Sequence, residues 1–305
     1  MNGAAIPPGK KNYLTGCMMF AAVTFALIAV LAVAMWGLQK QTSFVPGLGK
    51  RIAIVELKGE IQDSRDMVDE LDDYGEDNSI RAVVLRIDSP GGGVAASQEI
   101  YEAVRRLRAR KKPVVVSMGT FCASGGYYVA CAADTLVANP GTITASIGVI
   151  MEIPTAAELM KKLGVKWEII RSGRAKGAGV TWKDMTEDER ASLQGLIDDS
   201  YGQFVDAVAA ERGMERREVL AVADGRALTG QQALRVGLVD KLGDLKAAID
   251  VAAGMAGIEG KPVLARHRGE EPGIWDVLRK VANQKWVGPA LLDPAPRVRL
   301  EYRVF

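Results

Sequence analysis

Residues that usually carry catalytic chemistry are scarce in this sequence. The 305 residues include one histidine, His267, and three cysteines, Cys17, Cys122 and Cys131. The cysteines lack CxxC spacing and have no neighbouring cluster of histidine or cysteine, which argues against both a zinc site and a disulfide framework. We therefore expect three free thiols, no bound metal and no cofactor.

A strong charge imbalance is also missing. The chain holds 39 basic and 37 acidic residues, for a net charge of +2, and no basic stripe is interleaved with aromatic residues. Nucleic acid is therefore not expected as a partner. With 48% apolar and 25% charged residues, the composition is that of a globular protein able to bury a sizeable core.

Charged residues are absent from positions 13–38, near the N-terminus. This run is long enough to cross about 30 Å of hydrocarbon, so we expect a transmembrane helix. Lys10 and Lys11 precede it, and the positive-inside rule then places residues 1–12 in the cytoplasm and the residues after the helix outside. A cleaved signal peptide is the alternative, but the run is too long for one and no A-x-A cleavage site follows it.

Beyond a linker at 39–50, short β-rich runs alternate with amphipathic helical patterns. The β-rich runs, several of them apolar on both faces, are 52–57, 82–87, 114–118, 135–138 and 166–171. This rhythm predicts an α/β domain over 51–258 with largely parallel strands and right-handed crossovers. The composition changes after this domain, so 259–305 is expected to form a C-terminal tail.

Two of the helical patterns are clear. The apolar spacing of residues 96–110 predicts a helix with one buried face. The sequence TEDE at 186–189 is a capping box, and it opens a second helix. That helix carries one apolar stripe, expected in the core or at a subunit interface: Leu193, Leu196, Ile197, Tyr201, Phe204, Val205 and Val208.

Two glycine-rich turns each follow a predicted strand, "DSPGGG" at 88–93 and "CASGGYY" at 122–128. The carboxyl ends of parallel strands are where α/β proteins build their sites, and backbone N–H groups at a helix start can stabilise an oxyanion. Either turn alone is an ordinary strand-to-helix connection. As a pair, with Ser124 inside the second turn, they indicate a catalytic serine.

A serine hydroxyl is a weak nucleophile until a base removes its proton. His267 lies in the proline-rich tail between Arg266 and Arg268, so we interpret it as a surface residue rather than the base. Lys176, in the glycine-rich stretch "RSGRAKGAGVTW", is another candidate, because a lysine can act as a base when burial disfavours its ammonium form. Taken alone, this stretch is more typical of an exposed loop lysine than of a base.

Four stretches occur along the chain in this order: "RIDSPGGGV", "ASGGYYVACAAD", "TASIGVI" and "RSGRAKGAG". Together they resemble the motifs of the short form of the signal peptide peptidase A family. The resemblance covers roughly residues 50–255. It implies the Clp protease/crotonase-like α/β fold and a bacterial serine protease that cleaves remnant signal peptides. It further implies a homo-oligomeric ring anchored in the cytoplasmic membrane by one N-terminal helix, with the catalytic domain on the extracytoplasmic side.

The same resemblance assigns roles to individual residues. The serine of the "ASGG" motif is Ser124, the nucleophile, and the lysine of the "SGxxKxxG" motif is Lys176, the general base. Ser146, in the "SIG" motif, would orient the lysine amine. The backbone N–H groups of Gly92 and Gly125 would form the oxyanion hole. Since the implied substrates are hydrophobic peptides, small or apolar residues are expected at the cleaved position.

Two alternatives remain open at this point. A crotonase-type acyl-CoA enzyme would use the same glycine turns for a thioester, but it needs a placed Glu or Asp that neither turn supplies. An inactive membrane scaffold of the same fold would be expected to have lost Ser124 or Lys176, and both are present. One departure from the family pattern is Asp88, where related proteases often carry Asn. Cys122 is interpreted as a packing residue rather than a nucleophile.

Overall fold

The computed structural model describes Phe25, Val30, residues 50–266 and residues 300–303. The predicted membrane helix at 13–38 lies outside the described residues except for Phe25 and Val30, and His267 lies outside them altogether. Among the helices that the structure does describe, none combines the length and the apolar character needed to cross a membrane.

The main sheet has eight strands. Six of them follow the order β10-β1-β2-β4-β5-β9, while β6 pairs with the end of β4 and β8 pairs with β6. All neighbours are parallel except β6 and β8. The strands are β1 (Arg51–Lys58), β2 (Ile80–Ser89), β4 (Val114–Ala123), β5 (Thr135–Ala138), β6 (Ile143–Ala145), β8 (Ala227–Thr229), β9 (Lys241–Leu242) and β10 (Val263–Arg266).

The central strands form where the sequence is rich in β-branched apolar residues. Val84 of β2 lies opposite Val115 of β4, and both side chains are fully buried. Strands covered on both faces are apolar throughout, as here. Four of the five predicted strands are confirmed. The fifth, at 166–171, is wrong: this stretch is irregular and exposed, because it has no neighbouring strand to pair with, and Ile170 is 97% exposed.

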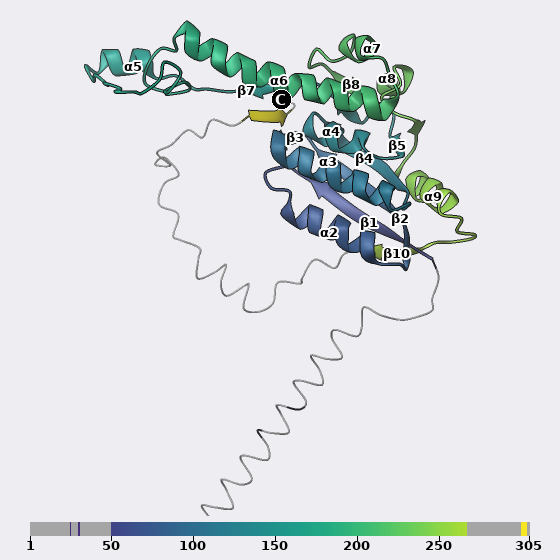
Figure 1. Cartoon of the computed structure of the whole chain (residues 1–305). Coiled ribbons are helices and arrows are strands. Elements are labelled where there is room, and N and C mark those ends of the chain that lie inside the picture. The colour runs from purple at the N-terminus through teal and green to yellow at the C-terminus, as the bar shows by residue number, and fades with distance from the viewer. Residues whose placement is uncertain (1–24, 26–29, 31–49, 267–299, 304–305) are drawn as a thin grey trace, which may run out of the picture. The chain divides into compact units, whose positions relative to one another are not determined.

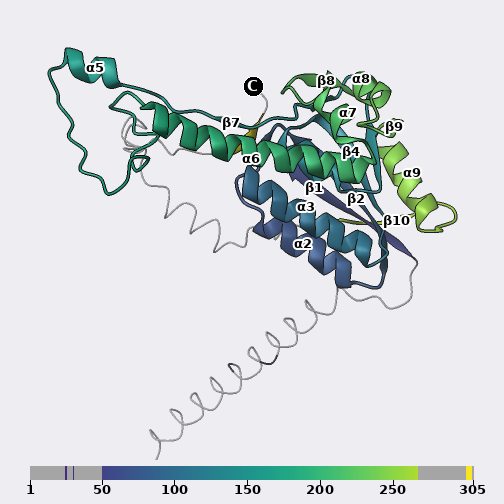
Figure 2. The same cartoon turned by 45° about the horizontal axis from the view of Figure 1, so that its top comes forward.

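Helices cover both faces of the sheet (Figures 1 and 2). One face carries α2 (Arg65–Glu76), α3 (Val94–Ala109), α4 (Gly125–Cys131) and α6 (Glu187–Arg212). Ile100, Val104 and Leu107 of α3 are buried in its core, which confirms the predicted helix at 96–110. Of the short helices, α7 (Arg216–Leu220) and α8 (Gly230–Arg235) lie near β8, whereas α5 (Ala157–Lys162) lies away from the body.

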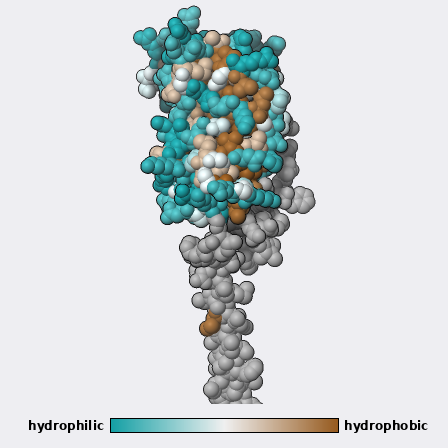
Figure 3. Space-filling model, turned by 90° about the vertical axis from the view of Figure 1, so that its right-hand side faces the viewer, coloured by the Kyte–Doolittle hydropathy of each residue, from teal (hydrophilic) through white to brown (hydrophobic). Residues whose placement is uncertain are grey.

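The other face packs against α9 (Leu245–Met255). Ala248 and Ala252 of this helix are buried against apolar side chains of the central strands. Apolar residues also gather in a band on the surface seen in Figure 3, the side of the molecule that carries α9 and β10. Met255, Val263 and Leu264 are exposed apolar residues of these two elements.

A second, antiparallel sheet has three strands in the order β3-β11-β7. They are β3 (Gly91–Gly93), β11 (Leu300–Arg303) and β7 (Ile150–Met151). The central strand comes from the end of the chain, far in sequence from its two neighbours. Both β10 and β11 fall in the range 259–305 that the sequence suggests to be a tail, and the structure pairs both with strands of the body.

Residues 152–186, between β7 and α6, form a segment that stands out from the body together with the first half of α6 (Figures 1 and 2). We call residues 152–186 the projecting segment. The segment is joined to the first turn of α6 by Glu189, a fully buried carboxylate that pairs with both Arg171 and Lys183. Glu189 also completes the predicted capping box with Thr186, which confirms the start of the second predicted helix.

Candidate active site

Ser124 lies at the turn from β4 into α4. Its backbone has φ 52° and ψ −118°, a conformation rarely adopted by a residue with a side chain. Its N–H donates to the carbonyl of Ala145 at 2.7 Å, and its own carbonyl accepts from the N–H of Tyr128 at 2.8 Å. A strained serine on a sharp strand-to-helix turn is the arrangement by which α/β hydrolases present a nucleophile.

The Ser124 hydroxyl is buried, with the residue only 1% exposed. Its Oγ has no hydrogen-bond partner among the described residues, and it is the one buried side-chain N or O atom there of which this is true. A buried hydroxyl without a partner costs about 1–3 kcal/mol. A group left in this state in a folded protein calls for a functional reason, such as a base or a substrate that binds there.

Three glycines bring backbone atoms together beside Ser124, and we call Gly91, Gly92 and Gly125 the glycine cradle. A Cβ atom built on Gly91 would lie 2.8 Å from the Gly125 nitrogen, and one built on Gly125 would lie 3.2 Å from the Gly92 nitrogen. Gly91 also has φ +108°, which residues with side chains rarely adopt. The two N–H groups named as oxyanion donors are therefore neighbours in space.

Ser146 follows β6, the strand paired with the end of β4. The register sets Ala123 opposite Ala145, so Ser124 and Ser146 leave adjacent strands at the same end. The Ser146 hydroxyl donates to the carbonyl of Gly225 at 3.3 Å, and the residue lines a cavity of about 600 Å³ with Tyr201 among its other walls. The structure thus brings Ser124, Ser146 and the glycine cradle together.

Lys176 is not part of this group. It lies in the projecting segment with its side chain exposed, and the structure records no hydrogen bond or ion pair of its amine with the described residues. Its backbone N–H donates to the carbonyl of Gly173 at 3.0 Å, within a turn. Within one chain the structure therefore does not place the predicted base at the serine.

Cys122, two residues before Ser124, is fully buried in β4. Burial raises the pKa of its thiol far above the ordinary value, which keeps the thiolate from forming. Cys131 is in the same situation at the end of α4. Both cysteines are packing residues. No group of three His, Cys, Asp or Glu side chains in the described part of the chain gathers in a way that could hold a metal ion.

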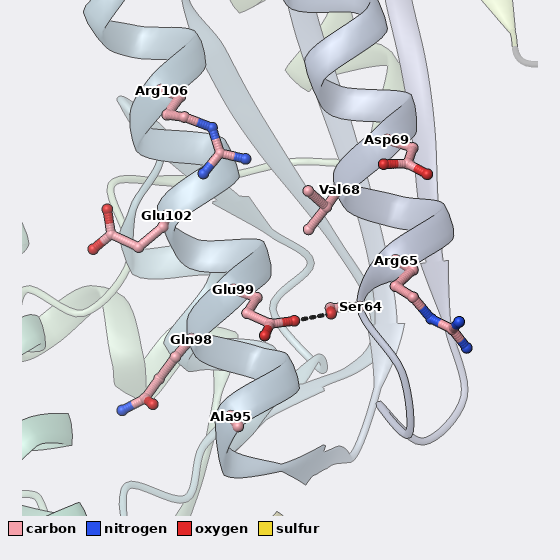
Figure 4. Close-up of a pocket in the computed structure, with 9 residues that line it drawn as sticks. All are labelled: Ser64, Arg65, Val68, Asp69, Ala95, Gln98, Glu99, Glu102 and Arg106. Atoms are coloured by element: carbon pink, nitrogen blue, oxygen red, sulfur yellow. Dashed lines mark hydrogen bonds between the residues drawn. The ribbon is translucent and has the colours of Figure 1, made fainter.

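A second cavity, of about 430 Å³, lies between α2 and α3 (Figure 4). Its lining is largely charged: Glu99 accepts a hydrogen bond from the Ser64 hydroxyl, and Arg106 pairs with Asp72 at 2.8 Å. None of the sequence motifs contributes a residue to its lining. We therefore place the candidate active site at Ser124 and leave this cavity outside it.

Sequence reasoning missed Tyr302 of β11. This residue is fully buried, and its ring stacks on Tyr128 with the centroids 5.3 Å apart and packs against Phe204 at 4.7 Å. Its hydroxyl donates to the carbonyl of Ser200 at 3.0 Å. The only signal in the sequence is the alternation of apolar residues at Leu300, Tyr302 and Val304, which does not identify a partner strand.

An α/β fold that presents a strained serine at a strand-to-helix turn, beside clustered glycine N–H groups, defines a serine hydrolase. Comparison with known proteins then gives the family. Residues 106–259 match the profile of peptidase family S49, and residues 48–162 match that of Clp protease. This chain belongs to peptidase family S49; it is a serine protease of the SppA type with a Clp protease-like α/β fold and a mixed sheet.

Similar proteins occur in several kinds of organism. A Synechocystis sp. protein named "Putative protease" is 44% identical over 211 residues, which cover 69% of this chain and 76% of the relative. A Methanocaldococcus jannaschii protein of the same name is 33% identical over 281 residues, or 87% and 89% of the two chains. The serine protease SPPA of Arabidopsis thaliana chloroplasts is 33% identical over 236 residues, covering 73% of this chain and 35% of that protein. Family membership favours a protease over the acyl-CoA alternative.

Proposed function

We propose that this protein is a membrane-anchored endopeptidase that cleaves remnant signal peptides and similar hydrophobic peptides with a Ser124–Lys176 dyad. One observation carries the proposal. The Ser124 hydroxyl is buried on a strained turn next to the glycine cradle, and the described part of the chain offers it no hydrogen-bond partner. These are the conditions for a nucleophile whose partners arrive with the substrate or with another part of the assembly.

The proposed reaction follows from the chemistry of these groups. The neutral amine of Lys176 takes the proton of Ser124 as its Oγ attacks the peptide carbonyl. The resulting oxyanion accepts hydrogen bonds from the N–H groups of Gly92 and Gly125. The lysine ammonium then protonates the leaving amine, and water activated by the same lysine releases the acyl-enzyme. Ser146 orients the lysine amine through its hydroxyl.

The dyad requires Lys176 to reach Ser124, and the projecting segment that carries it is rich in exposed apolar residues. Leu163 is 64% exposed, Trp167 56% and Ile170 97%. An exposed apolar surface of this kind marks an association surface. We therefore propose that copies of the chain associate through the projecting segment in a ring, and that Lys176 of one copy completes the site at Ser124 of its neighbour.

The location of the enzyme follows from the N-terminal residues. The uncharged run at 13–38 would anchor the chain in a bacterial cytoplasmic membrane by a single helix. Lys10 and Lys11 would keep the N-terminus in the cytoplasm, so residues 39–305 would lie outside it. Signal peptide remnants remain in that membrane after cleavage, and the proposed active site would lie on the side where they are released.

Labelling with an active-site serine reagent, followed by peptide mapping, tests this function. We expect the adduct on the peptide that contains Ser124, and neither labelling nor peptide hydrolysis in the Ser124→Ala variant. Ser117→Ala is a matched control, since Ser117 is a buried serine on the same strand β4, and it should still be labelled. An adduct on another residue, or normal hydrolysis by Ser124→Ala, would overturn the proposal.

A further inference from the structure

Basic residues gather at the edge of the main sheet where the parallel strands β1, β2 and β4 begin, opposite the end that carries Ser124. Four chain segments meet there, and we call them together the basic edge: 50–51, 77–81, 110–112 and 257–261. They hold seven basic residues and only two acidic ones, Asp77 and Glu259. The proposed reaction uses none of these residues.

Direct contacts hold the four segments side by side. The Lys112 amine donates to the carbonyl of Asp77 at 2.7 Å, and the Lys50 amine donates to the carbonyl of Gly257 at 2.9 Å. The first residue of β1 lies opposite the first residue of β2, which joins the remaining two segments. Segments that are far apart in the sequence therefore form one continuous surface.

The positive charge of this surface is largely unopposed. Of its seven basic side chains, only Arg110 forms an ion pair within the described part of the chain, and its partner Glu76 is 3.8 Å away. Burial lowers the pKa of Lys112. Asp77 opposes this shift, whereas the like charges of Arg110 and Arg81 add to it. Basic groups of the edge thus lie close enough to repel one another.

Exposed apolar side chains lie beside the same edge, on the side of the molecule that Figure 3 shows. Met255, the last residue of α9, is 45% exposed, and Val263, the first residue of β10, is 50% exposed. Val263 lies opposite Arg51 in the pairing of β10 with β1. Apolar side chains that enter the headgroup region and basic side chains that meet anionic headgroups are the two contributions to binding at a membrane surface.

The chain also enters the domain at this edge. Lys50 is the last residue of the linker at 39–50, which follows the predicted membrane helix at 13–38. A linker of this length spans at most about 40 Å when fully extended. The proposed anchor would therefore keep the basic edge near the bilayer at a high effective concentration, where even a weakly attractive surface binds.

From these observations we infer that the basic edge docks on the surface of a bilayer that carries anionic lipid headgroups. The inference rests on the proposed membrane anchor. It has a consequence for the substrate, because the ten residues of β4 lead from this edge to Ser124 and span about 30 Å. With the sheet standing on the basic edge, the active site reaches only peptides that extend about that far from the membrane.

Quenching of a fluorophore by lipids tests the docking in the full chain, reconstituted into vesicles. The label is attached at Met255→Cys or, for comparison, at Glu187→Cys, an exposed position of α6. Cys17→Ser removes a competing thiol, and Cys122 and Cys131 are buried. The vesicles contain phosphatidylcholine alone or mixed with phosphatidylglycerol, together with a lipid that carries a quencher on its headgroup.

We expect quenching at position 255 in the vesicles with phosphatidylglycerol, much less in phosphatidylcholine alone, and none at position 187. Salt at about 1 M should reverse it, because the Debye length falls to about 3 Å. Quenching at 187 instead of 255 would show that another face meets the bilayer and would overturn the inference. Release of the edge by added duplex DNA would also overturn it, because the surface would then bind polyanions in general.

Variants of the basic edge separate docking from the total charge of the protein. Lys50→Gln, Arg81→Gln and Lys111→Gln together should abolish the quenching at position 255, since each basic residue near an anionic surface contributes a factor of about five. A matched control removes three exposed basic residues elsewhere: Arg190→Gln, Arg217→Gln and Lys246→Gln. The control should be quenched like the parent, and an equal loss in both triple variants would contradict the inference.

Peptides held in the same vesicles by an acyl chain test the position of the active site. Two peptides share one cleavable sequence and differ in the flexible spacer that joins it to the acyl chain, one much shorter and one longer than about 30 Å. We expect the long-spacer peptide to be cleaved at least about tenfold faster, because a spacer that cannot span the distance gives almost no effective concentration. Equal rates for both peptides would overturn the inference.

Two further measurements distinguish failure of the docking from failure of the proposed function. Ser124→Ala should lose hydrolysis while the label at position 255 is still quenched, and quenching that depended on Ser124 would contradict the docking. Extraction of the vesicles at alkaline pH tests the anchor. A chain that is extracted would overturn the membrane helix, whereas a chain that stays in the vesicles without quenching at position 255 would overturn the docking alone.

Discussion

The backbone N–H of Ser124 donates a 2.7 Å hydrogen bond to the carbonyl of Ala145. This hydrogen bond joins the ends of β4 and β6, at the point where each strand leaves the sheet. Ala145 itself has φ 59° and the following Ser146 has φ 50°, so positive φ values occur at the ends of both strands. The pairing of β4 with β6 maintains these strained conformations and keeps the two serines at one end of the sheet, where a base could reach both.

The first prediction concerns the role of Lys176 as the general base. Lys176→Ala should lower kcat by at least about 10³-fold, and Ser124→Ala by a similar factor, with the double variant little worse because the members of the proposed dyad would act as a unit. A base that must be neutral to act gives a rate that rises with pH. Lys176→Arg should be as inactive as Lys176→Ala, because a guanidinium cannot deprotonate in this range.

His267 provides the control for that experiment. His267→Ala should leave the pH profile of the parent protein unchanged, since the histidine has no role in the proposed reaction. Near-normal turnover by folded Lys176→Arg, or loss of activity in His267→Ala, would show that the Ser-Lys mechanism is wrong.

Mixing two inactive variants tests where the base comes from. If Lys176 completes the site of a neighbouring copy, Ser124→Ala and Lys176→Ala proteins should regain activity when they are dissociated and assembled together, because some sites then combine an intact serine with an intact lysine. Hydrolysis of a hydrophobic peptide measures the recovery, and size-exclusion chromatography with differently tagged variants confirms mixing. Mixed assemblies that stay inactive would place both residues of the dyad in one chain.

Gly91 should not tolerate a side chain. A Cβ atom there would lie 1.9 Å from a backbone oxygen, and the backbone has φ +108°. We expect Gly91→Ala to shift the glycine cradle and lower kcat/KM by about 10²-fold, as a displacement of about 1 Å does in an active site. Gly141→Ala is the control, since a Cβ there meets nothing within 4 Å, and its kinetics should match the parent protein.

The Glu189 network should make the projecting segment sensitive to acid. A hydrogen bond from Lys183 is the main cause that lowers the pKa of Glu189 to about 2, with the Thr186 backbone N–H second. A carboxylate with a lowered pKa stabilises the fold above the ordinary value of 4.5, and this contribution is lost as the pH falls toward 2. We therefore expect the segment to loosen across that interval.

The stacked pair Trp167 and Trp182, with ring centroids 5.1 Å apart in the projecting segment, provides a fluorescence reporter of this change. The signal should change between pH 4.5 and 2 in the parent protein. In Glu189→Gln it should already be altered at neutral pH and vary little with acid. Glu187→Gln, an exposed residue of the same helical turn, should behave like the parent. A parent-like titration in Glu189→Gln would rule out this network as the cause.

The orientation of the chain is tested with reporter fusions. A periplasmic reporter joined to the C-terminus should be active, and a cytoplasmic one inactive, because Lys10 and Lys11 are expected to keep the N-terminal side in the cytoplasm. Activity of the cytoplasmic reporter would contradict the predicted topology.

Much of the fold was readable from local patterns. The runs at 52–57, 82–87, 114–118 and 135–138 became strands because β-branched apolar residues are covered on both faces of the sheet. The run at 166–171 also contains β-branched and aromatic residues but is irregular, since such residues form a strand only beside a partner. Local composition cannot say whether that partner exists.

The features of the candidate site also divide into those that local sequence encodes and those that depend on distant contacts. The glycine turns, the place of Ser124 between a strand and a helix, and the family can be read from the sequence, because they depend on neighbouring residues and on the order of motifs. Three features became visible only in the fold: the burial of the Ser124 hydroxyl, which has no hydrogen-bond partner among the described residues, the exposure of Lys176, and the position of β11 between β3 and β7. These outcomes depend on contacts between distant residues, such as the hydrogen bond from Tyr302 to Ser200 across 102 positions, which no short stretch of sequence encodes.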